Sequence, residues 1–197
     1  MTPQAKSVLE LFRSAGAYLE GHFRLTSGLH SSAYLQCALV LQQPAAAETL
    51  AGMLAEEIRK LSSARIELVV SPALGGLIIG HEVARALGTR FLFTERDAAT
   101  RQMTLRRGFT VARGEKAVVV EDVITTGGST HDVIHLLRAG GVDVVAAASI
   151  IDRSGGSADV GVPRAALATL QVAAYPPEEC PLCRLGIPVV KPGSRPT

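Results

Sequence analysis

One segment of the chain brings together the residue types that hold a sugar phosphate. Residues 117–130 read AVVVEDVITTGGST, so four apolar residues precede the acidic pair Glu121 and Asp122. Thr125 to Ser129 then supply hydroxyls and glycines at the start of an expected helix, where free backbone N–H groups favour a phosphate. Carboxylates beside that phosphate accept hydrogen bonds from sugar hydroxyls or attract a metal-bridged group. The spacing therefore predicts a site for a ribose 5-phosphate.

The same segment also suits an ordinary strand–turn–helix with a solvated acidic pair. It is not a Walker loop, because no Gly-Lys-Ser/Thr follows the glycines, and it lacks the G-x-G-x-x-G of dinucleotide-binding proteins. Its full pattern resembles the phosphoribosyl pyrophosphate (PRPP) motif of the type I phosphoribosyltransferases. The resemblance implies a Mg²⁺ ion held mainly through PRPP, without direct protein ligands. It implies PRPP contacts from the whole stretch, namely Glu121, Asp122, Val123, Ile124, Thr125, Thr126, Gly127, Gly128 and Ser129.

A second stretch, residues 21–37, alternates apolar and polar residues on both sides of Ser27-Gly28, which predicts two short strands. A structural flap is one interpretation of this hairpin. Its pattern F-x-L-x-S-G-x-x-S-x-x-Y, from Phe23 to Tyr34, resembles the hood over the base site of orotate phosphoribosyltransferases. That resemblance implies orotate contacts from Phe23 and Ser27. Thr26 stands where the family often has a lysine.

Small residues follow a second apolar strand, Glu67–Val70. The sequence SPALGG, residues 71–76, leads into a helix expected over Leu77–Leu87. In the family the corresponding loop holds pyrophosphate, often with a cis peptide, which would fall between Ala73 and Leu74. Some relatives have a lysine where Gly75 stands, so the backbone would have to make that contact here.

Five arginines and one acid occupy the segment between Arg96 and Arg113, within the least regular part of the chain, 95–114. A solvated hairpin and a mobile loop for an anionic ligand fit this charge pattern equally. In the orotate family a loop at this position reaches the active site of the neighbouring subunit. The resemblance therefore implies a homodimer and catalytic roles for Arg96 and Arg101, beside Glu121 and Asp122. Arg106 and Arg107 are further substitutes for the family's lysines and histidine.

An arginine follows the long apolar strand expected over Val142–Ile151. Because ligands bind beyond the carboxyl ends of parallel strands, Arg153 should face the same crevice as the acidic pair. The alternative interpretation is that Arg153 is a single arginine that forms a salt bridge on the surface. The Asp152-Arg153 pair resembles the orotate-binding segment of the family, which implies orotate contacts from Arg153 and Thr125.

The elements that position these residues alternate between strands and helices. Further helices are expected over 3–14 and 44–61, and further strands over 89–94 and 165–172, the last one in the chain. The predicted fold class is α/β, the type I phosphoribosyltransferase fold, with a central, mostly parallel sheet flanked by helices and a small N-terminal hood. We expect a single domain, 1–197, made of a helix and hood (1–40), an α/β core (41–172) and a C-terminal tail (173–197).

Composition narrows the class of protein. The 197 residues are 47% hydrophobic, which indicates a well-buried globular protein. A net charge of +2 does not suggest nucleic acid, and three cysteines fit a reducing cytoplasm. The N-terminus has no apolar signal core, and the uncharged stretch 68–80 is shorter than the ~20 residues of a membrane-spanning helix. We expect a cytoplasmic protein that binds neither membranes nor nucleic acid.

The tail contains a C-x-x-C pattern, Cys180 to Cys183, which invites a zinc or redox interpretation. One pair supplies only two ligands, Cys37 is distant, and no histidine is close in the sequence. A tight structural turn is therefore the preferred interpretation, and a metal shared between two subunits stays open.

Together the resemblances cover nearly the whole chain, in matching order. They imply an orotate phosphoribosyltransferase activity, in which orotate and PRPP give orotidine 5′-phosphate and pyrophosphate in pyrimidine synthesis. A purine phosphoribosyltransferase would share the PRPP motif but lack the hood. A non-catalytic PRPP-sensing regulator would carry a DNA-binding appendage, and residues 1–20 predict one helix only.

Overall fold

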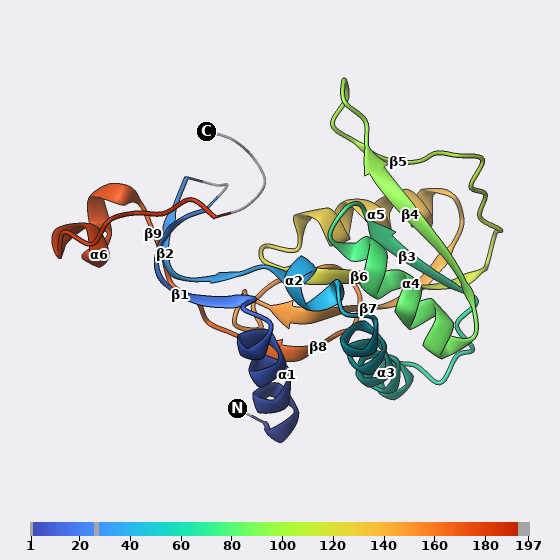
Figure 1. Cartoon of the computed structure of the whole chain (residues 1–197). Coiled ribbons are helices and arrows are strands. Elements are labelled where there is room, and N and C mark those ends of the chain that lie inside the picture. The colour runs from blue at the N-terminus through green and yellow to red at the C-terminus, as the bar shows by residue number, and fades with distance from the viewer. Residues whose placement is uncertain (1, 26–27, 193–197) are drawn as a thin grey trace.

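A six-stranded sheet forms the body of the protein (Figure 1). The computed structural model describes residues 2–25 and 28–192. The strand order is β5-β4-β3-β6-β7-β8, and every neighbouring pair is parallel except β4 with β5. The α/β class with a mostly parallel sheet is therefore confirmed. The strands are β3 (Leu68–Pro72), β4 (Arg90–Arg96), β5 (Met103–Leu105), β6 (Lys116–Ile124), β7 (Asp143–Asp152) and β8 (Arg164–Thr169).

Both faces of the central strand β6 are covered by helices. Because side chains alternate along a strand, Val118 and Val120 join the core under α1, α3 and α4. Ala117 and Val119 join the core under α5 on the other face. An uninterrupted apolar run is what such a doubly covered strand requires. The helices of the body are α1 (Pro3–Ser14), α2 (Cys37–Leu41), α3 (Pro44–Leu61), α4 (Gly76–Leu87) and α5 (Gly128–Ala139).

The long helix α3 has the predicted bounds. Pro44 stands in its first turn, where a missing N–H costs nothing, and Leu50, Leu54 and Ile58 bury one stripe against the sheet.

The hood is a second, smaller sheet of order β1-β2-β9. The two predicted strands are confirmed as β1 (Tyr18–Arg24) and β2 (His30–Leu35), which pair antiparallel. The expectation that 165–172 is the last strand is wrong, because the tail returns to the hood and adds β9 (Ala174–Tyr175) to the edge of β2. A short 3-10 turn, Pro177–Glu179, and helix α6 (Pro181–Arg184) follow.

The basic segment is partly a regular hairpin, as one of its two interpretations predicted, because β5 pairs antiparallel with β4, placing Met103 opposite Arg96. Two local expectations change. Cys37 begins helix α2 and does not end a strand. The C-x-x-C pattern does have histidines beside it: His22 and His30 of the hood come close in space although they are distant in sequence.

In the part of the chain that the structure describes, none of the helices combines the length and the apolarity needed to cross a lipid bilayer.

Candidate active site

The acidic pair lies within β6, which continues past Val120 to Ile124. Glu121 Oε2 accepts a hydrogen bond of 2.5 Å from the hydroxyl of Thr130, in the first turn of α5. Asp122 Oδ1 accepts one of 2.9 Å from the backbone N–H of Val123. Sequence reasoning missed Thr130. The feature that could have revealed it is its position: a hydroxyl residue in the first helical turn after the glycines can reach the end of the preceding strand.

Burial makes this pair poor at holding negative charge without a ligand. It raises the pKa of Glu121 to about 7, and the neighbouring charge of Asp122 adds to the rise, against the Thr130 hydrogen bond and the charge of Arg96. Burial likewise raises the pKa of Asp122. Hydroxyl donors from a ligand would replace the lost hydration and favour the charged carboxylates.

The turn between β6 and α5 has the features of a phosphate site. Gly127 adopts φ 82° just before α5, and a Cβ there would lie 2.9 Å from Val160 Cγ1, so only glycine fits. The first N–H groups of a 12-residue helix have no partner within that helix. Thr125 and Thr126 are exposed beside them. The predicted role of this turn in holding a phosphate stays a prediction.

The loop after β3 meets the acidic pair. The peptide between Ala73 and Leu74 is cis, as expected, and the Leu74 side chain is 82% exposed. A Cβ on Gly75 would lie 2.6 Å from Asp122 Oδ1, closer than atoms can pack. A side chain at position 75 would therefore have to displace the Asp122 carboxylate from the place that it occupies here.

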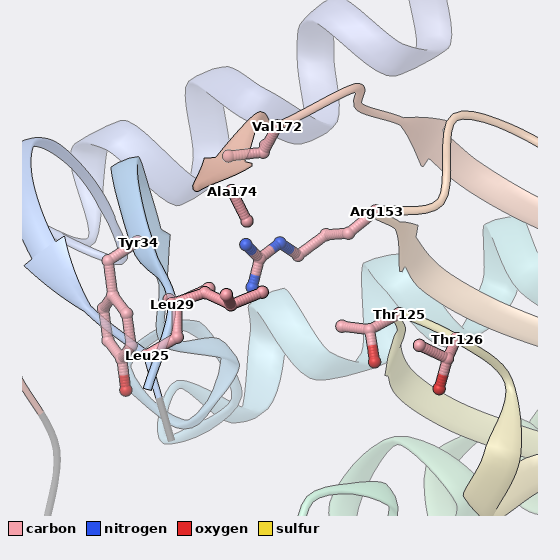
Figure 2. Close-up of a pocket in the computed structure, with 8 residues that line it drawn as sticks. All are labelled: Leu25, Leu29, Tyr34, Thr125, Thr126, Arg153, Val172 and Ala174. Carbon is pink, nitrogen blue, oxygen red and sulfur yellow. The ribbon is translucent and has the colours of Figure 1, made fainter. Parts of the chain in front are cut away.

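Arg153 extends into a cavity of about 450 Å³ between hood and body (Figure 2). Its Nε is buried and has no hydrogen-bond acceptor among the described residues. Burial lowers the pKa of the guanidinium, which is a cost that an anionic ligand would remove. The expected orientation of Arg153 toward the crevice is found. The cavity is lined by Leu25, Leu29, Tyr34, Thr125, Thr126, Arg153, Val172 and Ala174.

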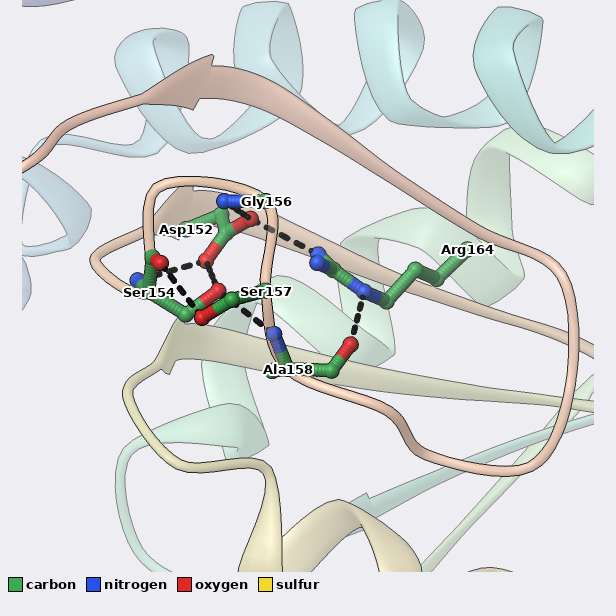
Figure 3. Close-up of polar contacts among 6 residues, drawn as sticks. All are labelled: Asp152, Ser154, Gly156, Ser157, Ala158 and Arg164. Carbon is green, nitrogen blue, oxygen red and sulfur yellow. Dashed lines mark hydrogen bonds and ion pairs between the residues drawn. The ribbon is translucent and has the colours of Figure 1, made fainter.

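The acid next to Arg153 has a different partner. Asp152 is buried, and its Oδ2 lies 2.8 Å from Arg164 Nη1 (Figure 3). Its Oδ1 accepts bonds of 2.7 and 2.6 Å from the N–H and hydroxyl of Ser154. Burial alone would raise the pKa of Asp152, but the bonds from Ser154 and Arg164 lower it. Sequence reasoning missed Arg164, because nothing in the sequence around it indicates a contact with Asp152.

The hood forms the far wall of the cavity through Leu25, Leu29 and Tyr34. Phe23 is buried, with its ring centroid 5.9 Å from that of Tyr34, and is not among the described residues that line the cavity. Ser27, the other hood residue expected to contact orotate, lies outside the described residues.

The basic hairpin β4–β5 projects beyond the sheet (Figure 1). Arg96 pairs with Asp132 of α5 at 2.8 Å and donates to the carbonyl of Arg101. Arg107 pairs with Glu95 through two hydrogen bonds. Arg101 is exposed, as is Arg106. Arg96 thus contacts α5, from where its charge lowers the pKa of Glu121, and Arg101 is exposed on the hairpin.

Known proteins resemble the chain over nearly its whole length. Residues 38–164 match the family described as the phosphoribosyl transferase domain. The orotate phosphoribosyltransferase of Heliobacterium modesticaldum is 52% identical over 188 residues, which cover 95% of this chain and 97% of that protein. The orotate phosphoribosyltransferase of Thermotoga petrophila is 51% identical over 188 residues, 95% of this chain and 98% of that protein.

Solved structures agree with this similarity. The crystal structure of orotate phosphoribosyltransferase from Aeropyrum pernix is 28% identical with a TM-score of 0.69, covering 83% of this chain and 94% of that chain. Adenine phosphoribosyltransferase from Trypanosoma brucei, at 16% identity and a TM-score of 0.62, covers 85% of this chain and 79% of that chain, and shares the fold alone. From the domain match and the identity to these relatives, the chain belongs to the orotate phosphoribosyltransferase family.

Proposed function

We propose that the chain transfers the 5-phosphoribosyl group of PRPP to orotate, giving orotidine 5′-phosphate and pyrophosphate. The observation that carries this proposal is Arg153, whose buried Nε lacks an acceptor in a cavity that adjoins Thr125 and Thr126 of the phosphate turn. A buried N–H of a cationic group without an acceptor is costly unless a ligand supplies one. Orotate carries a carboxylate that a guanidinium binds through two parallel hydrogen bonds.

PRPP would span the junction of the three loops. The free N–H groups and hydroxyls of Thr125–Ser129 would hold its 5-phosphate. Glu121 and Asp122 would accept hydrogen bonds from the ribose hydroxyls. The backbone at Ala73–Leu74 and the guanidinium of Arg96 would receive the pyrophosphate. Support comes from the contact of Gly75 with the Asp122 carboxylate, which brings the pyrophosphate loop to the ribose end of the site.

Catalysis then depends on position and charge. As pyrophosphate leaves, positive charge develops on the ribose ring, and the carboxylates of Glu121 and Asp122 would stabilise it. Arg153, together with Thr125, would hold orotate with its ring nitrogen toward the ribose. The apolar hood residues Leu25 and Leu29 would exclude water, which would otherwise hydrolyse PRPP.

Mg²⁺ is part of this proposal as a partner of PRPP. The carboxylates of Glu121 and Asp122 would accept hydrogen bonds from the ribose, and two carboxylates would in any case supply only part of an octahedral set. Most of the ligands would therefore come from PRPP itself. When bound, the ion neutralises charge on the leaving pyrophosphate.

We further propose a cytoplasmic homodimer in which the basic hairpin serves the neighbouring subunit. The hairpin projects beyond the rest of the sheet (Figure 1), and Arg101 in its turn and Arg106 just after β5 are exposed. The three cysteines, all among the described residues, form no disulfide, in keeping with a reducing compartment.

The decisive experiment offers the protein PRPP and Mg²⁺ with orotate, uracil, adenine or xanthine, and measures pyrophosphate release. We expect release with orotate alone, because the other bases lack the carboxylate that Arg153 would bind. Release with adenine but not orotate would indicate a purine enzyme. Binding of PRPP without release with any base would indicate a non-catalytic sensor.

A further inference from the structure

Four side chains from two distant parts of the chain meet beside the hood, outside the cavity. His22 lies on β1, His30 on β2, and Cys180 and Cys183 lie at the start of α6. Their ligand atoms, one from each residue, all lie within 4.8 Å of one another. His22, His30 and Cys180 are buried, and Cys183 is exposed.

The distances fit a tetrahedral metal site. Zinc bonds of about 2.3 Å to sulfur and about 2.0 Å to nitrogen place neighbouring ligand atoms about 3.3 to 3.8 Å apart. His22 Nε2 lies 3.5 Å from Cys180 Sγ and 3.6 Å from Cys183 Sγ, and His30 Nδ1 lies 3.2 Å from Cys183 Sγ. The two imidazole nitrogens are 2.8 Å apart, so they would separate by about half an ångström around an ion.

The protonation of His22 leaves a lone pair for the metal. Its Nδ1 lies 2.7 Å from the carbonyl oxygen of Ile187, which can only accept, so Nδ1 carries the proton and donates it. Nε2 is then unprotonated in the neutral ring and faces the two sulfurs. A carbonyl that fixes the ring of a histidine ligand in this way is typical of protein metal sites.

The tail has too little apolar burial to hold itself in place. Between residues 171 and 192, the only buried residue is Cys180. Leu185 is 72% exposed and Val190 54% exposed. Backbone bonds join the tail to β1, from Arg24 N–H to Val190 O at 2.9 Å and from Val190 N–H to His22 O at 2.8 Å. A segment with so little core usually needs a disulfide or a metal to keep its fold.

We propose that His22, His30, Cys180 and Cys183 bind one structural Zn²⁺ ion, which fastens the C-terminal tail to the hood. Two thiolates and two imidazoles in a closed tetrahedron are a ligand set that selects zinc and leaves no open position for catalysis. Ala174 of the tail, Val172 just before the tail and Leu29 of the hood line the cavity of Arg153. The ion would thus also stabilise the orotate pocket, a consequence that rests on the proposed function.

The test begins with metal content. The full-length protein, produced with zinc in the medium, should contain one zinc ion per chain by elemental analysis. After removal of zinc and addition of Co²⁺, it should show the intense visible bands of tetrahedral cobalt together with thiolate-to-cobalt charge transfer. Chelation of zinc should lower the Tm of the wild-type protein.

Matched variants locate the site. Cys183→Ser and His30→Ala should lose the zinc and the cobalt bands. Cys37→Ala and His135→Ala should keep both, because Cys37 lies in the main core and His135 is exposed on α5. Titration of the wild-type protein with Co²⁺ decides the question without variants if Cys183→Ser does not fold.

Two results would overturn the proposal. One is a folded protein, purified with zinc supplied, that contains none and shows no tetrahedral cobalt spectrum. The other is a Cys180–Cys183 disulfide in the protein isolated from a reducing cytoplasm. Zinc content does not depend on the substrate, so a protein that binds zinc but ignores orotate would refute the proposed activity and leave the metal site intact.

Discussion

Arg164 Nη1 lies 2.8 Å from Asp152 Oδ2, and this pair leaves the adjacent Arg153 free to face the cavity. Without Arg164, Asp152 would lack its cationic partner, and the cation closest to it in the sequence would be Arg153. The strand β8 thereby supplies the cation that satisfies Asp152, and Arg153, directly after the end of β7, extends into the cavity.

Replacing Arg164 should therefore harm stability as well as orotate binding. Arg164→Met leaves a buried carboxylate without its partner, which should cost about 3 kcal/mol in the free energy of unfolding. Urea unfolding measures this cost. Lys116→Met is the matched control, because its pair with Asp143 is exposed and should cost less than about 1 kcal/mol. An equal loss in the free energy of unfolding in both variants would show that burial of the Arg164–Asp152 pair does not raise its contribution to stability.

Arg153→Met should change the kinetic constants for orotate but not those for PRPP. Loss of a charge-assisted pair with the orotate carboxylate should lower kcat/KM for orotate by about a hundredfold. The KM for PRPP should stay near the wild-type value, and the Tm should not fall, because the substitution removes a buried group whose Nε lacks an acceptor. Steady-state kinetics with each substrate varied in turn checks both statements. An unchanged KM and kcat for orotate would show that Arg153 does not bind it.

Stability should fall as the pH rises through the neutral range because of Glu121. The folded pKa of about 7 lies above the usual range of a glutamate, so the folded state binds more protons than the unfolded state between about pH 4.5 and 7. Above pH 7, burial of the charged Glu121 carboxylate should lower the free energy of unfolding by up to about 3 kcal/mol. Glu121→Gln should flatten most of the slope in urea unfolding measured across the window between about pH 4.5 and 7, with a remainder from Asp122, whose pKa burial also raises. Exposed Glu56→Gln should keep the slope.

Gly75→Ala should damage the site with little effect on the fold. The added Cβ would displace the Asp122 carboxylate, whose Oδ1 would lie 2.6 Å away, so turnover should fall at least tenfold. Gly52→Ala on α3 is the control, because nothing lies within 4 Å of its added Cβ and it should gain about 0.5 to 1 kcal/mol. Full activity in Gly75→Ala would mean that the position of Asp122 is not critical.

Two inactive variants should restore each other if the basic hairpin serves the partner subunit. Asp122→Asn removes an acid of the site, and Arg101→Ala removes a cation of the hairpin. Unfolded together and refolded as a mixture, they should form some dimers with one complete site and regain part of the activity. Co-refolding of Asp122→Asn with Glu121→Gln is the control, since both lesions lie in one site and no rescue is expected. Absence of rescue in the first mixture would place Arg101 in its own subunit's site.

The sequence predicted those features that local patterns determine. The apolar run Ala117–Val120 marks a strand covered on both faces, and Pro44 with its leucine stripe marks the bounds of α3. The glycine and threonine turn before α5 was also predicted, because its geometry depends on a few consecutive residues.

Features that depend on contacts between distant segments were not predicted. β9 has two residues and exists only because β2 offers an edge to it. The approach of His22 to Cys180 joins positions far apart in the chain, so a search for nearby histidines had no local pattern to detect. The pair of Arg164 with Asp152 likewise follows from the pairing of β7 with β8.

The return of the tail has a consequence for solubility. A small sheet normally presents unpaired backbone at its two outer strands, where another molecule can add and begin aggregation. Here Val190 bonds to the outer side of β1, and the two-residue β9 caps β2. The hood therefore offers little template for intermolecular strand addition, and loosening of the tail should expose the molecule to self-association before the main body unfolds.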